Sequence, residues 1–198
     1  MNLENYLYDG LNKDIPESGG LLIAEPMMED TFVGRSVCLI IDTPETGGHA
    51  GLLLNKPGDV SLTQLLPDGV LTKELKVFCG GPVDLERLTV LHTLGDRLGN
   101  SLEIKPGLFI GAEIDKIIDY VEEGYPTEGK IRLFLGYCGW SDGQLASEIE
   151  RKSWAVNNHR DSSLLLSGEG LAYWRREVEL KGESLKSWLN VPPNPYCN

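Results

Sequence analysis

The chain passes from a strand to a helix at Gly136-Tyr137-Cys138-Gly139-Trp140-Ser141-Asp142-Gly143-Gln144-Leu145. Apolar residues dominate positions 130–135 and predict the strand. The glycines that follow indicate a turn. Ser141 and Gln144 have the spacing of a capping box, which predicts a helix that starts at Asp142 and buries Leu145 and Ile149.

Further strands and helices are predicted on both sides of this stretch. Ile114, Ile117, Ile118 and Val121 recur at helical spacing among acidic residues, which predicts an amphipathic helix. Short strands outnumber helices and do not alternate regularly with them, which favours a mixed α+β fold over a doubly wound parallel sheet. The other predicted strands are 21–24, 36–41, 50–55 with an end at Lys56-Pro57-Gly58, 76–79, 88–93, 101–105, 108–110 and one near Trp154 and Val156; the other predicted helices are 61–66, 171–180 and a last turn at 184–189, and 43–48 is a predicted loop.

The length of 198 residues favours a single domain over 1–198. Residues 1–19 are predicted to form a loosely attached arm, and residues 191–198 an irregular tail that prolines interrupt. The start of the chain lacks the basic and apolar regions of a signal peptide, and no apolar run approaches the roughly 20 residues of a membrane span. The cysteines show no C-x-x-C spacing, and Cys38 and Cys79 lie in apolar runs, so we expect reduced thiols in a cytoplasmic protein.

Acidic residues dominate the charge, with 30 Asp and Glu against 18 Lys and Arg and a formal net charge of -12. Residues 1–140 hold 22 acidic and 11 basic side chains, whereas residues 141–198 hold 8 and 7. Neither part has a basic cluster that could neutralise phosphates. Direct binding of DNA or RNA is therefore not expected.

The predicted turn at Gly136–Gln144 has two interpretations. Backbone N–H groups at the start of a helix attract anions, so the turn could bind an anionic ligand with Trp140 as a flat contact surface. The simpler interpretation is that the glycines fit a tight turn, Trp140 packs, and Ser141 caps the helix. Cys138 could act as a nucleophile here, but nothing in the sequence selects a histidine as its base.

Two further segments invite a functional reading. Gly80-Gly81-Pro82-Val83 lacks the lysine of a P-loop, so we interpret it as a tight chain reversal. His92 lies in an apolar strand, where a hydrogen-bonded core histidine is favoured over a metal site shared with Cys79.

Arg35 and Asn55 flank two predicted buried strands. The guanidinium of Arg35 could bind the carboxylate of a ligand. It could equally pair with Glu29 or Asp30, and the internal pair is favoured. No set of residues converges on a catalytic mechanism.

Several short motifs follow one another in a particular order. They are Gly20-Leu21-Leu22-Ile23-Ala24 with Pro26 and Met28, Phe32 with Arg35-Ser36-Val37, Gly51-Leu52-Leu53-Leu54-Asn55-Lys56-Pro57, Gly80-Gly81-Pro82-Val83, Leu91-His92-Thr93, and Gly136-Tyr137-Cys138-Gly139-Trp140 with Gly143-Gln144-Leu145, Glu148-Ile149 and Trp154. In this order they resemble the YqgE/AlgH family of bacterial proteins. The resemblance runs from about Gly20 to Trp188.

This resemblance implies a compact fold with a branched, largely antiparallel, barrel-like sheet flanked by helices, in a bacterial cytoplasmic protein. It implies no established enzymatic activity. The family carries the label of transcriptional regulator, which the negative net charge disfavours as direct DNA binding. Asp42 stands where the family usually has His, and Cys138 where it usually has a small residue such as Ala, so neither a histidine nor a cysteine catalyst is carried over.

The sequence therefore favours a non-enzymatic regulatory or adaptor module that binds a protein or a small molecule. The alternative is an enzyme or small-ligand sensor that uses Gly136–Gln144 as an anion-binding turn. No cofactor, metal, nucleic-acid or membrane partner is expected. The predicted binding surface comprises Arg35, Asn55, Gly80, Gly81, His92, Gly136, Gly139, Trp140, Ser141 and Gln144.

Overall fold

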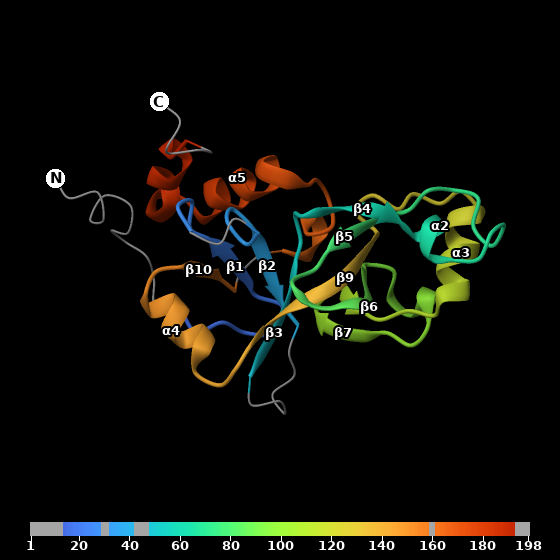
Figure 1. Ribbon diagram of the computed structural model, residues 1–198, viewed down its shortest axis with the longest axis horizontal. Helices are drawn as coiled ribbons and strands as arrows, with labels where there is room; N and C mark the ends of the chain where they lie inside the picture. Colours follow the sequence, from blue (N-terminus) through green and yellow to red (C-terminus); the bar gives the residue numbers. More distant parts are fainter. Residues whose placement is uncertain (1–13, 29–31, 42–47, 159–160, 193–198) are drawn as a thin grey trace. The chain divides into compact units, whose positions relative to one another are not determined.

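A computed structural model describes residues 14–28, 32–41, 48–158 and 161–192 (Figure 1). These residues form two compact units. The first unit holds the described residues up to Asn55, those from Gly139 to residue 158, and those from Gly168 onward; the second holds Lys56–Cys138 and Asp161–Ser167. Most of the predicted arm, most of the loop at 43–48 and the end of the tail lie outside the described residues. Both units contain strands and helices, so the predicted mixed α+β class is confirmed.

The sheet of the first unit is antiparallel. β1 (Leu21–Ala24) pairs with β2 (Val37–Ile40) and with β10 (Trp154–Asn157), and β2 also pairs with β3 (His49–Leu53). Every residue of β1, β2 and β10 is buried, which explains why these strands read as continuous apolar runs rather than as alternating ones.

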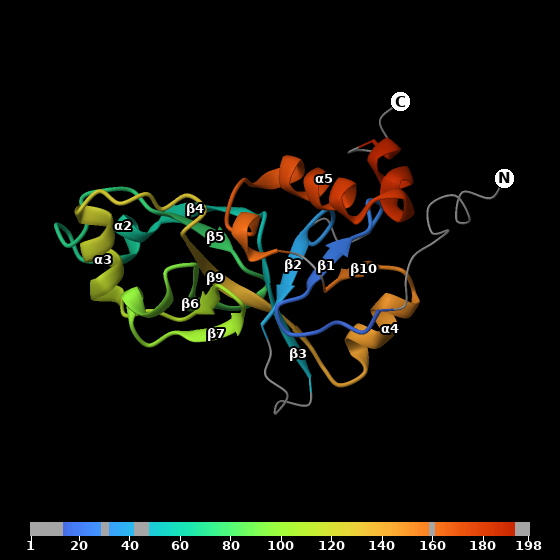
Figure 2. The same cartoon turned by 180° about the vertical axis from the view of Figure 1, so that it is seen from behind.

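Helices from the C-terminal part of the chain pack on this sheet. α5 (Gly170–Lys181) lies beside β1 and β2, as Figures 1 and 2 show from opposite sides. Its Trp174 donates an indole hydrogen bond to the carbonyl of Ala24 at 2.8 Å and stacks on Trp188, with ring centroids 6.5 Å apart. Trp188 belongs to the 3₁₀ segment Glu183–Asn190, and α4 (Gln144–Glu150) contacts β10.

The second unit is organised around β9 (Ile131–Trp140), whose last two residues belong to the first unit. β5 (Lys76–Cys79) pairs with β9 in parallel and β6 (Val83–His92) pairs with it antiparallel. Because Phe134 is aligned with both Phe78 and Thr89, β5 and β6 must occupy opposite edges of β9. β3 is a further neighbour of β9, so the sheet is branched, as predicted.

The remaining elements of the second unit extend this sheet and cover it. β6 continues to β8 (Leu108–Ile110) and then to β7 (Leu102–Lys105), while β4 (Pro57–Ser61) pairs with β5; all these pairs are antiparallel. α3 (Ile114–Glu122) buries Ile117 and Val121 in a core shared with Leu62 of α2 (Leu62–Leu65). Two 3₁₀ turns complete the unit, at Gly95–Leu98 and Ser162–Leu164.

Gly80 and Gly81 carry the chain from β5 across β9 to β6. A Cβ atom on Gly81 (φ 156°) would collide with the backbone of Tyr137 and Cys138. A Cβ atom on Gly136 (φ 71°) would collide with the carbonyl oxygen of Gly81. The chain direction reverses here as predicted, but the reversal is a crossing of one backbone over another. Glycine is required on both sides because no side chain fits between the two backbones.

Three predicted boundaries are wrong. β9 runs on through Gly136–Trp140, so this segment is strand rather than turn, and the helix begins at Gln144 rather than Asp142. The strand at 50–55 does end before Lys56-Pro57-Gly58 as predicted, since β3 stops at Leu53, but Pro57 then starts β4, an unpredicted strand, at a position where proline breaks no ladder. β6 begins at Val83, five residues before the predicted start, because it follows β9 beyond Leu88 through an irregular register.

Gly81→Ala should lower the free energy of unfolding by about 3 kcal/mol or more, because the new methyl group meets backbone atoms that cannot move aside. The control is Gly95→Ala in the same unit, where φ is also positive (59°) but nothing lies within 4 Å of the new atom. That substitution should cost only about 1 kcal/mol of conformational strain. Urea unfolding of both variants measures the difference, and equal effects would contradict the backbone crossing.

Candidate functional site

The crossing brings together three residues of the predicted surface, Gly80, Gly81 and Gly136. The N–H of Gly80 donates to the carbonyl of Leu135 at 2.8 Å, and the Cys138 thiol lies 3.7 Å from the carbonyl of Gly80. Cys138 is 5% exposed. Its thiol faces a backbone acceptor at the crossing, which is a packing role for a small side chain rather than the exposed, electropositive setting of a reactive thiol.

His92 is fully buried in the second unit and stacks on Phe109, with ring centroids 5.5 Å apart. Its Nδ1 accepts the N–H of Leu94 at 3.3 Å, so the proton of the neutral ring resides on Nε2. Nε2 lies 2.9 Å from the carbonyl of Gly111 and 2.9 Å from Oγ of Ser101. A ring with this tautomer donates from Nε2, so it cannot take a proton from Ser101 as a general base does.

Burial lowers the pKa of His92 below its ordinary value of 6.5, and the hydrogen bond to Gly111 opposes this shift. Cys79 does not approach this ring. Cys79 is aligned with Leu135 on one edge of β9, and His92 with Ile131 on the other, about 13 Å away along the strand. Among the described residues, no group of three or more His, Cys, Asp or Glu side chains is placed to hold a metal ion.

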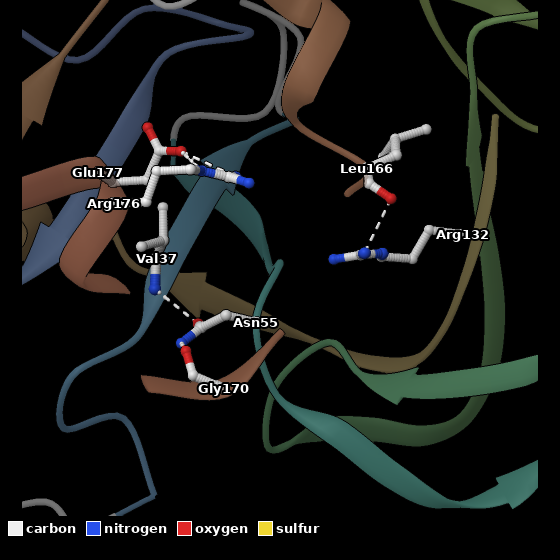
Figure 3. A network of polar contacts seen from close by, with 7 residues as sticks. All are labelled: Val37, Asn55, Arg132, Leu166, Gly170, Arg176 and Glu177. Atoms are coloured by element: carbon white, nitrogen blue, oxygen red, sulfur yellow. Dashed lines mark hydrogen bonds and ion pairs between the residues drawn. The ribbon is translucent and has the colours of Figure 1, made fainter. Parts of the chain in front are cut away.

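Asn55 links three segments of the first unit (Figure 3). Its side-chain oxygen accepts the N–H of Val37 at 2.8 Å, and its side-chain nitrogen donates to the carbonyls of Arg35 and Gly170 at 3.0 and 2.9 Å. The N–H of Gly170 donates back to the carbonyl of Asn55. The amide is 1% exposed and ties the start of β2 to the start of α5, which is a structural role.

Arg35 has a left-handed backbone (φ 51°) and reaches the C-terminal segment. Its guanidinium donates to the carbonyls of Val191 and Pro192 at 3.1 and 2.6 Å and lies over the ring of Trp174. Burial lowers the pKa of Arg35, and Glu25 opposes the shift. The predicted alternatives Glu29 and Asp30 lie outside the described residues.

Glu148 connects Trp140 to the start of α4, also in the first unit. Its Oε2 accepts the indole N–H of Trp140 at 2.9 Å and that of Trp154 at 2.8 Å, while its Oε1 accepts the side-chain amide of Gln144 at 2.9 Å. Gln144 in turn accepts the backbone N–H of Ser141 at 3.1 Å, but the predicted capping box is not formed, because Gly143 is the N-cap of α4 and no side chain caps this helix. We name these residues the Glu148 bracket: Trp140, Ser141, Gln144, Glu148 and Trp154.

The bracket presents a short exposed turn. Trp140 and Trp154 are buried, whereas Gly139, Ser141 and Gln144 are exposed, as are Asp142 and Gly143. We name Gly139–Gln144 the bracket turn. Trp140 and Gln144, near the two ends of the turn, both donate to the carboxylate of Glu148, so the turn is held at both ends while its surface is exposed.

Sequence reasoning missed the partners that organise these residues. Glu148 is central to the bracket, and Glu177 is fully buried beside Arg176 at 3.0 Å (Figure 3). In the second unit Arg132 is buried, donates to the carbonyl of Leu166 at 2.8 Å and lies over Phe78 (Figure 3). The sequence offered one signal of such a buried polar residue, which is the charged Arg132 inside an apolar strand.

The predicted surface resolves into separate groups within each unit. In the first unit Arg35 and Asn55 share one hydrogen-bonded network, and Trp140, Ser141 and Gln144 share the bracket. In the second unit Gly80, Gly81 and Gly136 meet at the crossing, whereas His92 lies farther along β9.

Helices in the described residues are all too short or too polar to span a membrane.

Comparison with known proteins places the chain in a family. Residues 21–186 match the AlgH-like family. The chain belongs to that family. A UPF0301 protein of Parabacteroides distasonis is 38% identical over 188 residues, which is 94% of each chain, and one of Bacteroides thetaiotaomicron is 31% identical over 100% of each.

Two solved structures share this fold. A crystal structure of a Corynebacterium diphtheriae protein superimposes with a TM-score of 0.74 at 26% identity and covers 94% of this chain and 98% of its own. The solution structure of AlgH from Pseudomonas aeruginosa gives a TM-score of 0.66 at 27% identity, over 88% and 93%. The AlgH-like fold is thus the mixed α+β fold with a curled, largely antiparallel sheet that the motifs of this chain suggested.

Glu148→Ala should lower the free energy of unfolding by about 2 to 4 kcal/mol, because it leaves two buried indole N–H groups without an acceptor. Glu150→Ala on the same helix is exposed and should change stability by less than about 0.5 kcal/mol. Glu148→Gln keeps one acceptor oxygen and should fall between them. Chemical denaturation followed by tryptophan fluorescence tests this order, and equal effects of the two alanine variants would refute the bracket.

Acidification should destabilise the protein through His92. Since the folded pKa lies below the ordinary 6.5, the unfolded chain binds the proton first. Stability is therefore full above pH 6.5 and falls as the pH drops from there towards the folded pKa. His92→Gln can still donate to Gly111 and should flatten the stability profile below about pH 7 relative to the unmodified chain. An unchanged slope in this variant would show that another group titrates.

Proposed function

We propose that this AlgH-like protein is a non-enzymatic regulatory or adaptor module, and that its partner binds the bracket turn, Gly139–Gln144. The observation that carries the proposal is the combination of a free surface with fixed ends: five residues of the turn are exposed, while Trp140 beneath them is buried and bonded to Glu148. Partners bind such preorganised segments without an added cost of ordering the loop.

The side chains that could take part in catalysis support a binding role instead. His92 donates from Nε2 and has no access to solvent, and the thiol of Cys138 is buried against a carbonyl. Both are engaged in holding the fold. The label of transcriptional regulator would then describe an indirect effect through a protein partner, because the chain has an excess of acidic residues.

The anion-binding alternative receives less support from the same turn. The N–H of Ser141 already donates to the side-chain oxygen of Gln144. Asp142 follows Ser141 directly in the sequence, and the carboxylate of Glu148 accepts a hydrogen bond from Gln144. An anionic ligand would meet negative charge there.

The described cysteines Cys38, Cys79 and Cys138 form no disulfide, which fits the reducing cytoplasm as the proposed compartment.

Charge reversal at the turn tests this proposal. Asp142→Arg alters the exposed turn without touching the bracket and should reduce recovery of a specific partner from bacterial lysate by about tenfold or more. Glu150→Arg, an exposed charge reversal on α4 outside the bracket turn, is the matched control and should recover the partner normally.

A thermal-shift screen with anionic metabolites separates the alternative. A metabolite that stabilises the unmodified chain but not Asp142→Arg would favour the ligand sensor. Recovery of every partner by Asp142→Arg would overturn the assignment of the bracket turn as the contact surface.

A further inference from the structure

The backbone just before β3 lies against the start of the bracket turn. Gly48 directly precedes β3, and β3 is a sheet neighbour of β9, which ends at Trp140. A Cβ atom on Gly48 would lie 2.5 Å from the carbonyl oxygen of Trp140, whereas carbon and oxygen atoms in contact are ordinarily about 3.3 Å or more apart. The bracket turn therefore leaves the sheet through a space that only glycine at position 48 keeps open.

The ring of Trp140 rests on the same strand. A Cβ atom on Gly51, within β3, would lie 3.3 Å from Cζ3 of Trp140 and 2.5 Å from Sγ of Cys38 on β2. The indole also donates to Glu148 and meets Trp154 edge-on, with ring centroids 6.0 Å apart. Trp140 is only 7% exposed among these neighbours. Bare backbone at Gly51 thus provides one side of the site in which the indole is buried.

Two separate parts of the first unit therefore hold Trp140. The carboxylate of Glu148 binds the indole N–H of Trp140 and the side chain of Gln144, so it fixes the distance between the two ends of the bracket turn. It does not fix where the turn leaves β9. The close approach of Gly48 to the carbonyl of Trp140 supplies that second restraint.

We propose that Gly48 is a positioning residue for the bracket turn. Because it has no side chain, the carbonyl of Trp140 can close on the backbone before β3, and this contact sets the place at which the turn leaves the sheet. Gly51 seats the ring of Trp140 in the same way. The consequence for binding rests on the proposed function: a partner meets the turn where β3 places it, so a displaced turn binds less well although its own residues are unchanged.

Gly48→Ala tests this role. The new methyl group forces the carbonyl of Trp140 back by roughly 0.8 Å, the difference between 2.5 Å and an ordinary contact. The chain has 4 tryptophans, and a proton–nitrogen correlation NMR spectrum resolves their indole N–H signals. The signals of Trp140 and Trp154 should shift, because both indoles donate to one carboxylate. Those of Trp174 and Trp188, which stack on each other, should stay in place.

The matched control is Gly58→Ala in the second unit, where the new Cβ atom would lie 2.6 Å from the carbonyl oxygen of Val77. It should lower stability as Gly48→Ala does but leave every indole signal in place. Unchanged signals in Gly48→Ala would overturn the proposal. So would a shift of all the indole signals or a failure of this variant to fold, since Gly48 would then serve the whole fold rather than the turn.

Partner binding separates this proposal from the proposed function. The partner that the unmodified chain recovers and Asp142→Arg loses should bind Gly48→Ala about tenfold more weakly, because the displaced turn must be reordered on binding. Shifted signals of Trp140 with normal partner binding would overturn the bracket turn as the contact surface and support the positioning role. Weaker binding without shifted signals would overturn the positioning role.

Discussion

The second unit depends on the crossing of two backbones at Gly81. β5 and β6 pair with opposite edges of β9, so the short connection between them must pass over that strand. It does so in contact with the backbone of Tyr137 and Cys138. A side chain at Gly136 on β9 would collide with the carbonyl oxygen of Gly81. Sterics alone demand glycine at both places. The parallel pairing of β5 and the antiparallel pairing of β6 with β9 are compatible with so short a connection only through this crossing.

Polar side chains that looked like candidates for chemistry complete the fold instead. Asn55 joins the start of β2 to the start of α5, Arg35 holds the C-terminal segment, and His92 binds two loops from inside the core. Burying such groups is favourable only when their hydrogen bonds are made within the protein. The exposed bracket turn is held by a different group, the carboxylate of Glu148, which binds Trp140 and Gln144.

Local signals were sufficient to predict most of the elements. β1, β5 and β8 occupy the predicted positions, because short apolar runs between breakers leave few alternatives. Helix α3 follows from its repeat of isoleucines, although Ile114 in its first turn is partly exposed. The extension of β9 through Gly136–Trp140 could not be predicted, because glycine is unfavourable in a strand and only the partners across the sheet compensate for it.

The sequence by itself determined the mixed α+β class, the family and the acidic character of the chain, since these reside in composition, spacing and the order of motifs. The tertiary structure decided what each candidate residue does. Glu148 became the acceptor for two indoles and His92 a donor to a carbonyl, because their partners lie on other segments of the chain. It also separated the exposed bracket turn from the buried glycine crossing, which are continuous in sequence. Burial and hydrogen-bond partners arise only when distant segments meet, and one sequence without its fold cannot specify those meetings.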